Sequence, residues 1–594
     1  MVVNFTNPFE VRTPEALSAQ EVAKLFVDVF SDFKKVDDQS HTFIQGPRGT
    51  GKSMMLRYME PDVQIAACKA ARIQDLEFFA LHIPIKKAWS DITEWDLLDG
   101  TMYQYLAEHL MISHITYCLF RSLSKNIEIS DLDKGVLDYL NSLLIGCGSK
   151  EINIDELCTL GSLTSHFHTE FNKIKSFVKR LMFSKPETLD YDGGLLSYLD
   201  FLVPLLEKLK EQTWGCGGPF YLMIDDADLL DVRMQRILNT WVSCRTIDSV
   251  CLKVATQNRY ATYRTIDGKL IESPHDYSEV NISELYTRKE NRYAKRVKDI
   301  IEKRLELVGI HVPVEEFFPE DLAQREKIEE IKCDLKSKHE AGKGRGTRAS
   351  DDVIRYATPI YMSMLAGKRK SSSTYSYAGF KSMVDLSSGI IRWFIDPAAK
   401  MFGELISSGN TQSKDAFTKE GKIAKIPPSI QDKVLKEWSY SFIDDELPKI
   451  EDKNEVDVEH SVYSKVHNLL VSLGMLFRER LLDEQASERK LLSFVLANPE
   501  ALRNETKKIL SLAVDLGYLQ YSSHGSKEGI GRKPKYTLSH RLAPYFQLDP
   551  SGYAYSMSIT SEILEIALVS PNRFVRSRLK GNDSSSLFQA SLDI

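Results

Sequence analysis

The chain has 594 residues, more than one hydrophobic core usually supports, and its length predicts about three or four domains. Hydrophobic residues make up 43% and charged residues 27% of the sequence, which is the balance of an ordinary soluble globular protein. Because the formal net charge is −6, the global field does not attract nucleic acid, and any contact with DNA requires a local basic patch.

The first motif is a glycine-rich turn that follows a short predicted strand beginning at His41. The turn fills the template G-x-x-x-x-G-K-[ST] without a mismatch, and Met54–Met59 is predicted to begin a helix. In such a turn the backbone N–H groups point at phosphates, the lysine neutralises β/γ-phosphate charge and the serine hydroxyl ligates Mg²⁺. The alternative is a glycine turn that matches by chance. We predict binding of ATP with Mg²⁺ through Gly46, Pro47, Arg48, Gly49, Thr50, Gly51, Lys52 and Ser53.

A second segment supplies the acids that such a site needs. Phe220–Ile224 is an unbroken apolar run, the pattern of a strand buried in a parallel sheet, and two aspartates follow it. Asp225 is predicted to hold Mg²⁺, and Asp226 is predicted to orient or deprotonate the attacking water. A helix N-cap cluster is the alternative interpretation of these acids. Aspartate is shorter than the glutamate often used at this place, so we expect slow hydrolysis.

The next predicted strand, Ser249–Thr256, ends in polar residues. Thr256, Gln257 and Asn258 are candidates to contact the γ-phosphate or the water, although a polar residue at a strand end is also common without a function. Between the predicted strand Leu76–Pro84 and Gly218 lies a stretch too long for a plain connection, with amphipathic helices predicted, for example, at Met102–Leu123 and Ser165–Phe183. We interpret this stretch as a helical insertion at about 98–213.

This layout resembles the AAA+ ATPases, in particular their origin-recognition-complex-like, initiator-type branch. Tyr293–Leu305 has apolar residues at helical spacing and is similar to the first helix of the AAA+ lid. Leu386–Phe394 is similar to the lid helix that carries the second sensor arginine. The resemblance implies an ATPase in which Arg392 acts on the γ-phosphate; a surface arginine is the alternative.

The C-terminal third predicts a winged helix-turn-helix. Helices are expected at 460–482, 488–497 and 504–516, followed by strands at 517–521 and 535–538 around a polar glycine loop. A basic loop of this kind is where a wing meets duplex DNA, although the same fold also serves protein contacts. The cations of the predicted wing are Lys527, Arg532, Lys533 and Lys535.

Together these patterns predict an α/β P-loop NTPase, and the resemblance implies that it is of the AAA+ type, with a helical insertion, an α-helical lid and a C-terminal winged helix-turn-helix domain. The predicted parts are a nucleotide-binding core at 1–285, a helical lid with flexible insertions at 286–400, a linker at 401–454, a winged-helix domain at 455–550 and a tail at 551–594.

We predict that the nucleotide state controls DNA binding or partner assembly. The alternatives are a signalling or anti-phage defence ATPase that recruits a separate effector protein, or a protein remodeller that docks partners on the winged helix. A homo-oligomer or an effector is the expected protein partner. No stretch reaches about 18 consecutive apolar residues, and the 8 cysteines form no CxxC pair. These features predict a cytoplasmic protein without a membrane contact.

Overall fold

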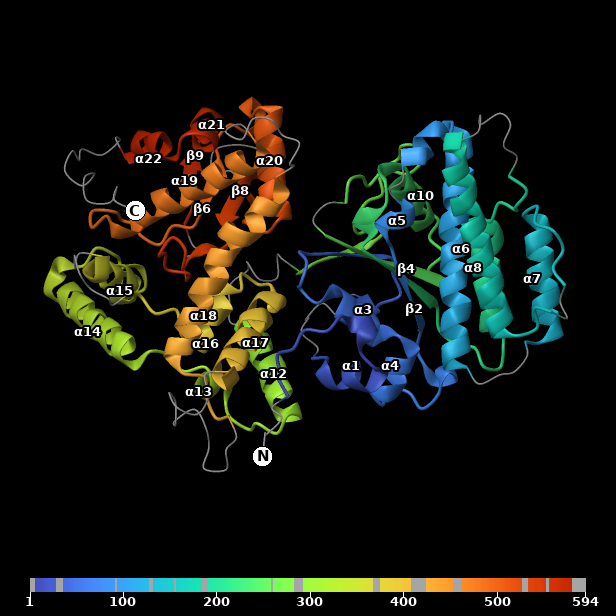
Figure 1. Ribbon diagram of the computed structural model, residues 1–594, viewed down its shortest axis with the longest axis horizontal. Helices are drawn as coiled ribbons and strands as arrows, with labels where there is room; N and C mark the ends of the chain where they lie inside the picture. The colour runs from blue at the N-terminus through green and yellow to red at the C-terminus, as the bar shows by residue number, and fades with distance from the viewer. Residues whose placement is uncertain are drawn as a thin grey trace. The chain divides into compact units, whose positions relative to one another are not determined.

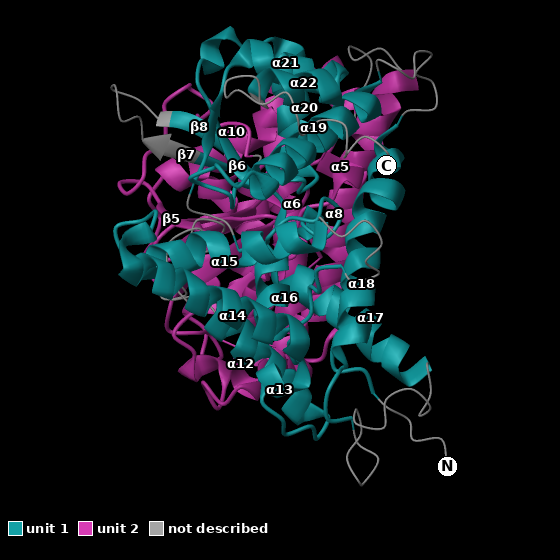
Figure 2. Cartoon of the chain, turned by 90° about the vertical axis from the view of Figure 1, so that its left-hand side faces the viewer, with its two compact units in different colours: residues 1–11, 286–594 teal, residues 12–285 magenta. Residues whose placement is uncertain are grey.

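The computed structural model describes residues 6–27, 36–90, 93–127, 132–153, 156–183, 191–257, 260–282, 292–366, 374–407, 423–451, 461–525, 532–551 and 555–579. The chain forms two compact units, shown in different colours in Figure 2. Unit 2 comprises Arg12–Leu285, and unit 1 comprises Met1–Val11 together with Tyr286–Ile594. The first residues of the chain therefore belong with its C-terminal half. Among the described residues, no helix has the length and apolar character needed to cross a membrane.

Unit 2 is built on a five-stranded sheet with the order β2-β3-β4-β1-β5, in which every neighbouring pair is parallel. Its central strands β3 and β4 are buried along their whole length, which explains their nearly continuous apolar sequences. The predicted strands that precede the glycine-rich turn and the two aspartates are confirmed. The strands are β1 (Thr42–Gln45), β2 (Phe79–Pro84), β3 (Phe220–Asp225), β4 (Val250–Thr256) and β5 (Ser278–Asn281).

Helices cover this sheet and extend into the predicted insertion, where α6 and α8 lie side by side (Figure 1). The first turn of α6 is capped by Asp99, whose side chain accepts the N–H of Met102, and Thr159 caps α8 in the same way. The helices of unit 2 are α1 (Ala19–Leu25), α3 (Lys52–Met59), α4 (Pro61–Ala66), α5 (Lys87–Ser90), α6 (Gly100–Asn126), α7 (Lys134–Gly146), α8 (Leu160–Arg180), α9 (Val203–Lys210) and α10 (Val232–Ser243), with short helical turns η1 (Pro14–Ala16), η2 (Ile73–Asp75), η3 (Thr93–Leu97), η4 (Leu181–Phe183), η6 (Tyr198–Leu202) and η7 (Ala227–Leu229).

Unit 1 combines helices with a four-stranded sheet of the order β7-β8-β6-β9. Its longer elements are α12 (Arg292–Leu307), α13 (Val314–Phe317), α14 (Leu322–Lys338), α15 (Ala349–Ala366), α16 (Phe380–Leu386), α17 (Ile391–Ser407), α18 (Pro428–Ser441), α19 (Val462–Leu482), β6 (Ser493–Leu496), α20 (Asn504–Asp515), β7 (Leu519–Gly525), β8 (Arg532–Leu538), β9 (Met557–Ile559), α21 (Ser561–Val569) and α22 (Pro571–Leu579). Its short turns are η8 (His339–Lys343), η10 (Phe442–Glu446), η11 (Leu447–Ile450), η13 (Pro499–Ala501) and η14 (His540–Leu542).

One continuous hydrophobic core runs from α12 through α18 to α22, so the helices of unit 1 and its sheet are packed together. Arg541 reinforces this packing, because its guanidinium carbon lies 4.2 Å from the ring centroid of Trp438 and 3.9 Å from that of Phe442. It also donates a hydrogen bond of 2.7 Å to Glu446. The N-terminal segment is held in the same unit, since Phe9 is fully buried in this core.

Two expectations about unit 1 were wrong. The predicted helix at 488–497 is replaced by strand β6, because Phe494 pairs with Tyr536 on one side and with Met557 on the other, and these pairings outweigh local helix propensity. The predicted helix at 386–394 is interrupted: α16 ends at Leu386 and α17 begins at Ile391. Ser388 and Gly389 between them both have positive φ, which ends a helix.

Candidate nucleotide-binding site

The glycine-rich turn connects β1 to α3 at the carboxyl edge of the unit 2 sheet. Gly49 and Gly51 have φ values of 85° and 99°, in the left-handed region that glycine adopts at little cost, and Gly51 is the N-cap of α3. At Gly46 the reason for glycine is space, because a Cβ there would lie 3.1 Å from Cβ of Ile282 and 3.3 Å from Oγ1 of Thr50. The predicted strand, turn and helix are therefore present, and the turn leads directly into the first residue of α3.

Lys52 is the buried cation of this turn. Its ammonium group donates hydrogen bonds to the carbonyl oxygens of Gly46 at 2.6 Å and Pro47 at 3.1 Å, and its side chain is folded back over the loop. Burial lowers the pKa of Lys52, and the nearby carboxylates of Asp225 and Asp226 offset this effect only in part. A loop that holds a desolvated cation together with a helix N-terminus is suited to an anion.

Asp225 ends β3 and is held by two groups. Its Oδ1 accepts the N–H of Asp226 at 3.0 Å, and its Oδ2 lies 3.2 Å from Nε2 of His82. The nearby Ser53 hydroxyl also favours the ionised carboxylate. Burial acts to raise the pKa of Asp225, but the bond and charge of His82, the Ser53 hydroxyl and the charge of Lys52 outweigh it and lower the pKa. Asp225 is therefore ionised and oriented.

Asp226 differs from its neighbour in both backbone and electrostatics. Its φ of 55° lies in the left-handed region, where aspartate and asparagine are the non-glycine residues found most readily. Burial raises its pKa, and the like charges of Asp225 and Asp228 raise it further. Two adjacent carboxyl groups whose pKa values are shifted in opposite directions are typical of sites that assign different roles to two acids.

Thr256 ends β4, the strand between β1 and β3. Its carbonyl oxygen accepts the N–H of Gly46 at 3.3 Å, which joins the strand end to the glycine-rich turn. Its hydroxyl is buried and has no hydrogen-bond partner within the part of the chain that the structure describes. The next residue, Gln257, donates its N–H to Asp228 at 2.9 Å, and Asn258 lies outside the described residues. An orphaned hydroxyl beside the turn is a polar group available to a ligand.

The remaining predicted site residues lie in unit 1. Arg392 is exposed in the first turn of α17, and Lys533 and Lys535 lie on β8. Burial lowers the pKa of Lys535. Lys527 and the side chain of Arg532 lie outside the described residues.

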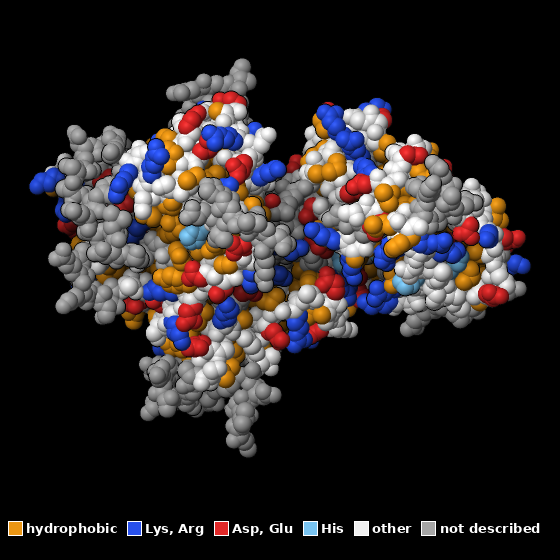
Figure 3. All heavy atoms as spheres, turned by 45° about the horizontal axis from the view of Figure 1, so that its top comes forward, with side chains coloured by type: hydrophobic (Ala, Val, Ile, Leu, Met, Phe, Trp, Pro, Cys, Tyr) orange, Lys and Arg blue, Asp and Glu red, His pale blue; other side chains and the backbone are white. Residues whose placement is uncertain are grey.

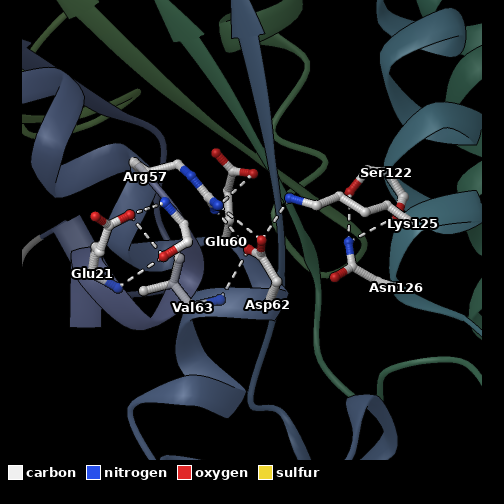
Figure 4. Close-up of polar contacts among 9 residues, drawn as sticks. Glu21, Arg57, Glu60, Asp62, Val63, Ser122, Lys125 and Asn126 are labelled. Atoms are coloured by element: carbon white, nitrogen blue, oxygen red, sulfur yellow. Dashed lines mark hydrogen bonds and ion pairs between the residues drawn. The ribbon is translucent and has the colours of Figure 1, made fainter. Parts of the chain in front are cut away.

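Two features of the site were not predicted from the sequence. One is His82, whose contact with Asp225 depends on the pairing of β2 with β3. The other is an ionic support behind α3, shown in Figure 4. Arg57 at the end of α3 donates two bonds to Asp62 at 2.6 Å and 2.8 Å, and Lys125 at the end of α6 donates a third at 2.6 Å. Burial acts against ionisation, but these bonds lower the pKa of Asp62 to about 2. The support joins the helix after the turn to the insertion.

The sequence matches the family described as ORC-CDC6-like over residues 7–343 and 331–559. The chain belongs to the ORC-CDC6-like family. The parallel sheet with its flanking helices is the α/β fold of AAA+ ATPases, and members of this ORC-CDC6-like group generally bind ATP with Mg²⁺ and hydrolyse it. No curated protein matches the sequence.

A solved structure of the Aeropyrum pernix ORC1 protein in complex with DNA is similar to this ORC-CDC6-like protein, with 12% sequence identity and a TM-score of 0.27. The similarity covers 97% of each chain.

Proposed function

We propose that this ORC-CDC6-like protein binds ATP with Mg²⁺ at Gly46–Ser53 and hydrolyses it. The observation that carries the proposal is that Lys52, Ser53, Asp225 and Asp226 lie together at one edge of the parallel sheet, where the Ser53 hydroxyl and the Lys52 charge both favour the ionised Asp225 carboxylate. The left-handed glycines of the turn, Gly49 and Gly51, and the orphaned hydroxyl of Thr256 both fit a phosphate chain.

Each group has a distinct role in this proposal. Backbone N–H groups of the turn bind the phosphates, and Lys52 leaves its carbonyl partners to neutralise the β/γ-phosphate charge. Ser53 and Asp225 would hold Mg²⁺, which would neutralise phosphate charge when bound. Asp226, with its raised pKa, accepts the proton of the attacking water as the water bonds to the γ-phosphorus, the bond from that phosphorus to the β–γ bridging oxygen breaks, and ADP leaves. The Thr256 hydroxyl donates a hydrogen bond to the γ-phosphate or to that water.

The test is Lys52→Ala, measured by isothermal titration with a non-hydrolysable ATP analogue. The variant loses the buried cation of the loop, so tight binding should be abolished. Lys87→Ala is the matched control, because it removes an exposed lysine of α5 in the same unit. Unchanged affinity of Lys52→Ala for the analogue would refute the assignment of the turn.

We also propose that the nucleotide state controls binding of duplex DNA through unit 1. In this proposal α12 to α17 form the lid, with Arg392 acting on the γ-phosphate, and α20 with the β7–β8 hairpin forms a winged helix. The antiparallel pairing of β7 with β8 from Leu519↔Leu538 to Gly525↔Arg532 supports a wing. The shared core of unit 1 supports the coupling, because Phe394 of α17 belongs to the same core as Leu519 of β7 and Leu538 of β8. Figure 3 shows acidic and basic side chains intermixed on the face in view, so we expect a localised DNA contact.

The DNA contact is tested by the slope of log affinity against log salt concentration. Replacing Arg532 and Lys533 by alanine should reduce this slope by roughly one to two units with little dependence on DNA sequence, because each phosphate contact releases counterions. Lys327→Ala with Lys336→Ala is the matched control, since it removes two exposed cations from α14 of the same unit. A wild-type slope in the Arg532/Lys533 variant would favour protein docking on this hairpin.

A further inference from the structure

A histidine lies behind the proposed metal ligand. β2 and β3 are parallel with His82 opposite Met223 and Pro84 opposite Asp225. Because side chains alternate along a strand, His82 and Asp225 point to the same face of the sheet. This face packs against α3, the helix that begins at Lys52. The pairing of β2 with β3 therefore places the imidazole of His82 beside the carboxylate of Asp225.

The contact of His82 with Asp225 is specific. Nε2 of His82 lies 3.2 Å from Oδ2 of Asp225, and the two side chains are 11% and 6% exposed. Oδ1 of the same carboxylate is occupied by the N–H of Asp226. Each oxygen thus has its own donor, which fixes both the position and the rotation of the carboxyl plane.

The surroundings of the ring favour donation of a proton from Nε2. A carboxylate oxygen of Glu15, Nε2 of His82 and a carboxylate oxygen of Asp225 all lie within 4.8 Å of one another. Glu60, whose carboxylate lies 3.2 Å from the guanidinium of Arg57, adds further negative charge near the ring. A ring among carboxylates is suited to act as a donor, because the protonated nitrogen meets acceptors on more than one side.

We infer that His82 is a positioning residue that holds Asp225 in the orientation needed to bind the divalent cation of the nucleotide. This inference rests on the proposed ATP–Mg²⁺ site. A simple packing role for His82 is the competing explanation, and so is direct ligation of the cation by the imidazole. The three explanations differ in which substitutions restore the site.

The test compares His82→Gln with His82→Asn. The amide nitrogen of glutamine reaches about as far as Nε2, whereas that of asparagine stops near the position of Nδ1, so only glutamine restores the donor to Asp225. Binding of a fluorescent ATP analogue is titrated with MgCl₂, and the same analogue is titrated in EDTA. We expect His82→Asn to raise the Mg²⁺ midpoint roughly 10-fold and His82→Gln to stay within about 3-fold of wild type, as for other residues that orient metal ligands. Affinity in EDTA should change less than about 2-fold in both variants, because Asp225 acts through the cation.

His114→Asn is the matched control, because His114 is another buried histidine, and its Nε2 lies 3.2 Å from the backbone carbonyl oxygen of Pro84 and makes no bond to the Asp225 carboxylate among the described residues. A wild-type Mg²⁺ midpoint in His82→Asn would overturn the positioning role. So would equal losses in His82→Asn and His114→Asn, which indicate packing alone. Equal losses in both His82 variants that are larger with MnCl₂ than with MgCl₂ would indicate direct ligation and also overturn it. If the wild-type protein binds the analogue without any response to Mg²⁺, the proposed ATP–Mg²⁺ site itself fails.

Discussion

Substitutions of Asp226 are expected to affect nucleotide binding, ATP turnover and folding stability differently. The position has a φ of 55°, and its carboxyl group has a pKa raised by burial and by the charges of Asp225 and Asp228. Asp226→Asn keeps a residue that tolerates the left-handed region and removes the like charge. Asp226→Ala also removes the charge, but alanine is less stable than asparagine in the left-handed backbone conformation. Both variants lose the acceptor for the proton of the attacking water.

The expected stabilities of the two variants follow from the loss of the buried charge and from the left-handed backbone at this position. A pKa that is raised in the folded state means that the folded protein is penalised once the group ionises, so the penalty is absent below the ordinary pKa and present at pH 7. Asp226→Asn should therefore be more stable than wild type at pH 7, with the difference disappearing in acid. The left-handed backbone should make Asp226→Ala less stable than Asp226→Asn by about 1 kcal/mol, or roughly 2 °C in melting temperature.

The assays are thermal unfolding without nucleotide, titration of an ATP analogue with Mg²⁺, and release of phosphate. Both variants should bind the analogue, because Lys52, Ser53 and Asp225 are unchanged, and turnover should fall about 10²- to 10⁴-fold. Turnover near the wild-type rate in Asp226→Asn would refute the role of Asp226 in proton transfer. A melting temperature of Asp226→Asn below that of wild type at pH 7 would refute the electrostatic reasoning.

Two further predictions concern unit 1. Arg392→Ala should reduce turnover more than it reduces affinity for ATP, because the proposed contact is with the γ-phosphate. Equal ATP and ADP affinities with normal turnover would show that Arg392 is a surface residue of α17 without a role in the site. Burial raises the pKa of Asp385 to about 7, so its contribution to stability is complete below about pH 4 and is lost as the pH rises through about 7. Asp385→Asn should abolish this part of the pH dependence, measured by chemical unfolding at pH 5 and pH 8, and a stability difference between wild type and variant that does not change with pH would contradict it.

Local patterns in the sequence were sufficient for the central part of unit 2. The glycine-rich turn is recognisable because left-handed glycines, a lysine and a hydroxyl at fixed spacing must follow one another along the chain. The strands that end at Asp225 and Thr256 are recognisable because a strand buried on both faces is apolar throughout. Nearly all of this information is contained within a few neighbouring residues.

The tertiary structure decided what depends on residues far apart in the chain. His82 meets Asp225 because β2 pairs with β3 across the whole helical insertion, and no spacing in the sequence encodes that contact. Residues 493–496 became strand β6 because partners on both sides offered backbone hydrogen bonds. Phe9 joins unit 1, since Asn7 bonds to the carbonyl oxygen of Ala399 and Arg304 bonds to that of Pro8. Periodicity and motifs describe what one segment can do by itself, whereas these arrangements depend on which segments the folded chain brings together.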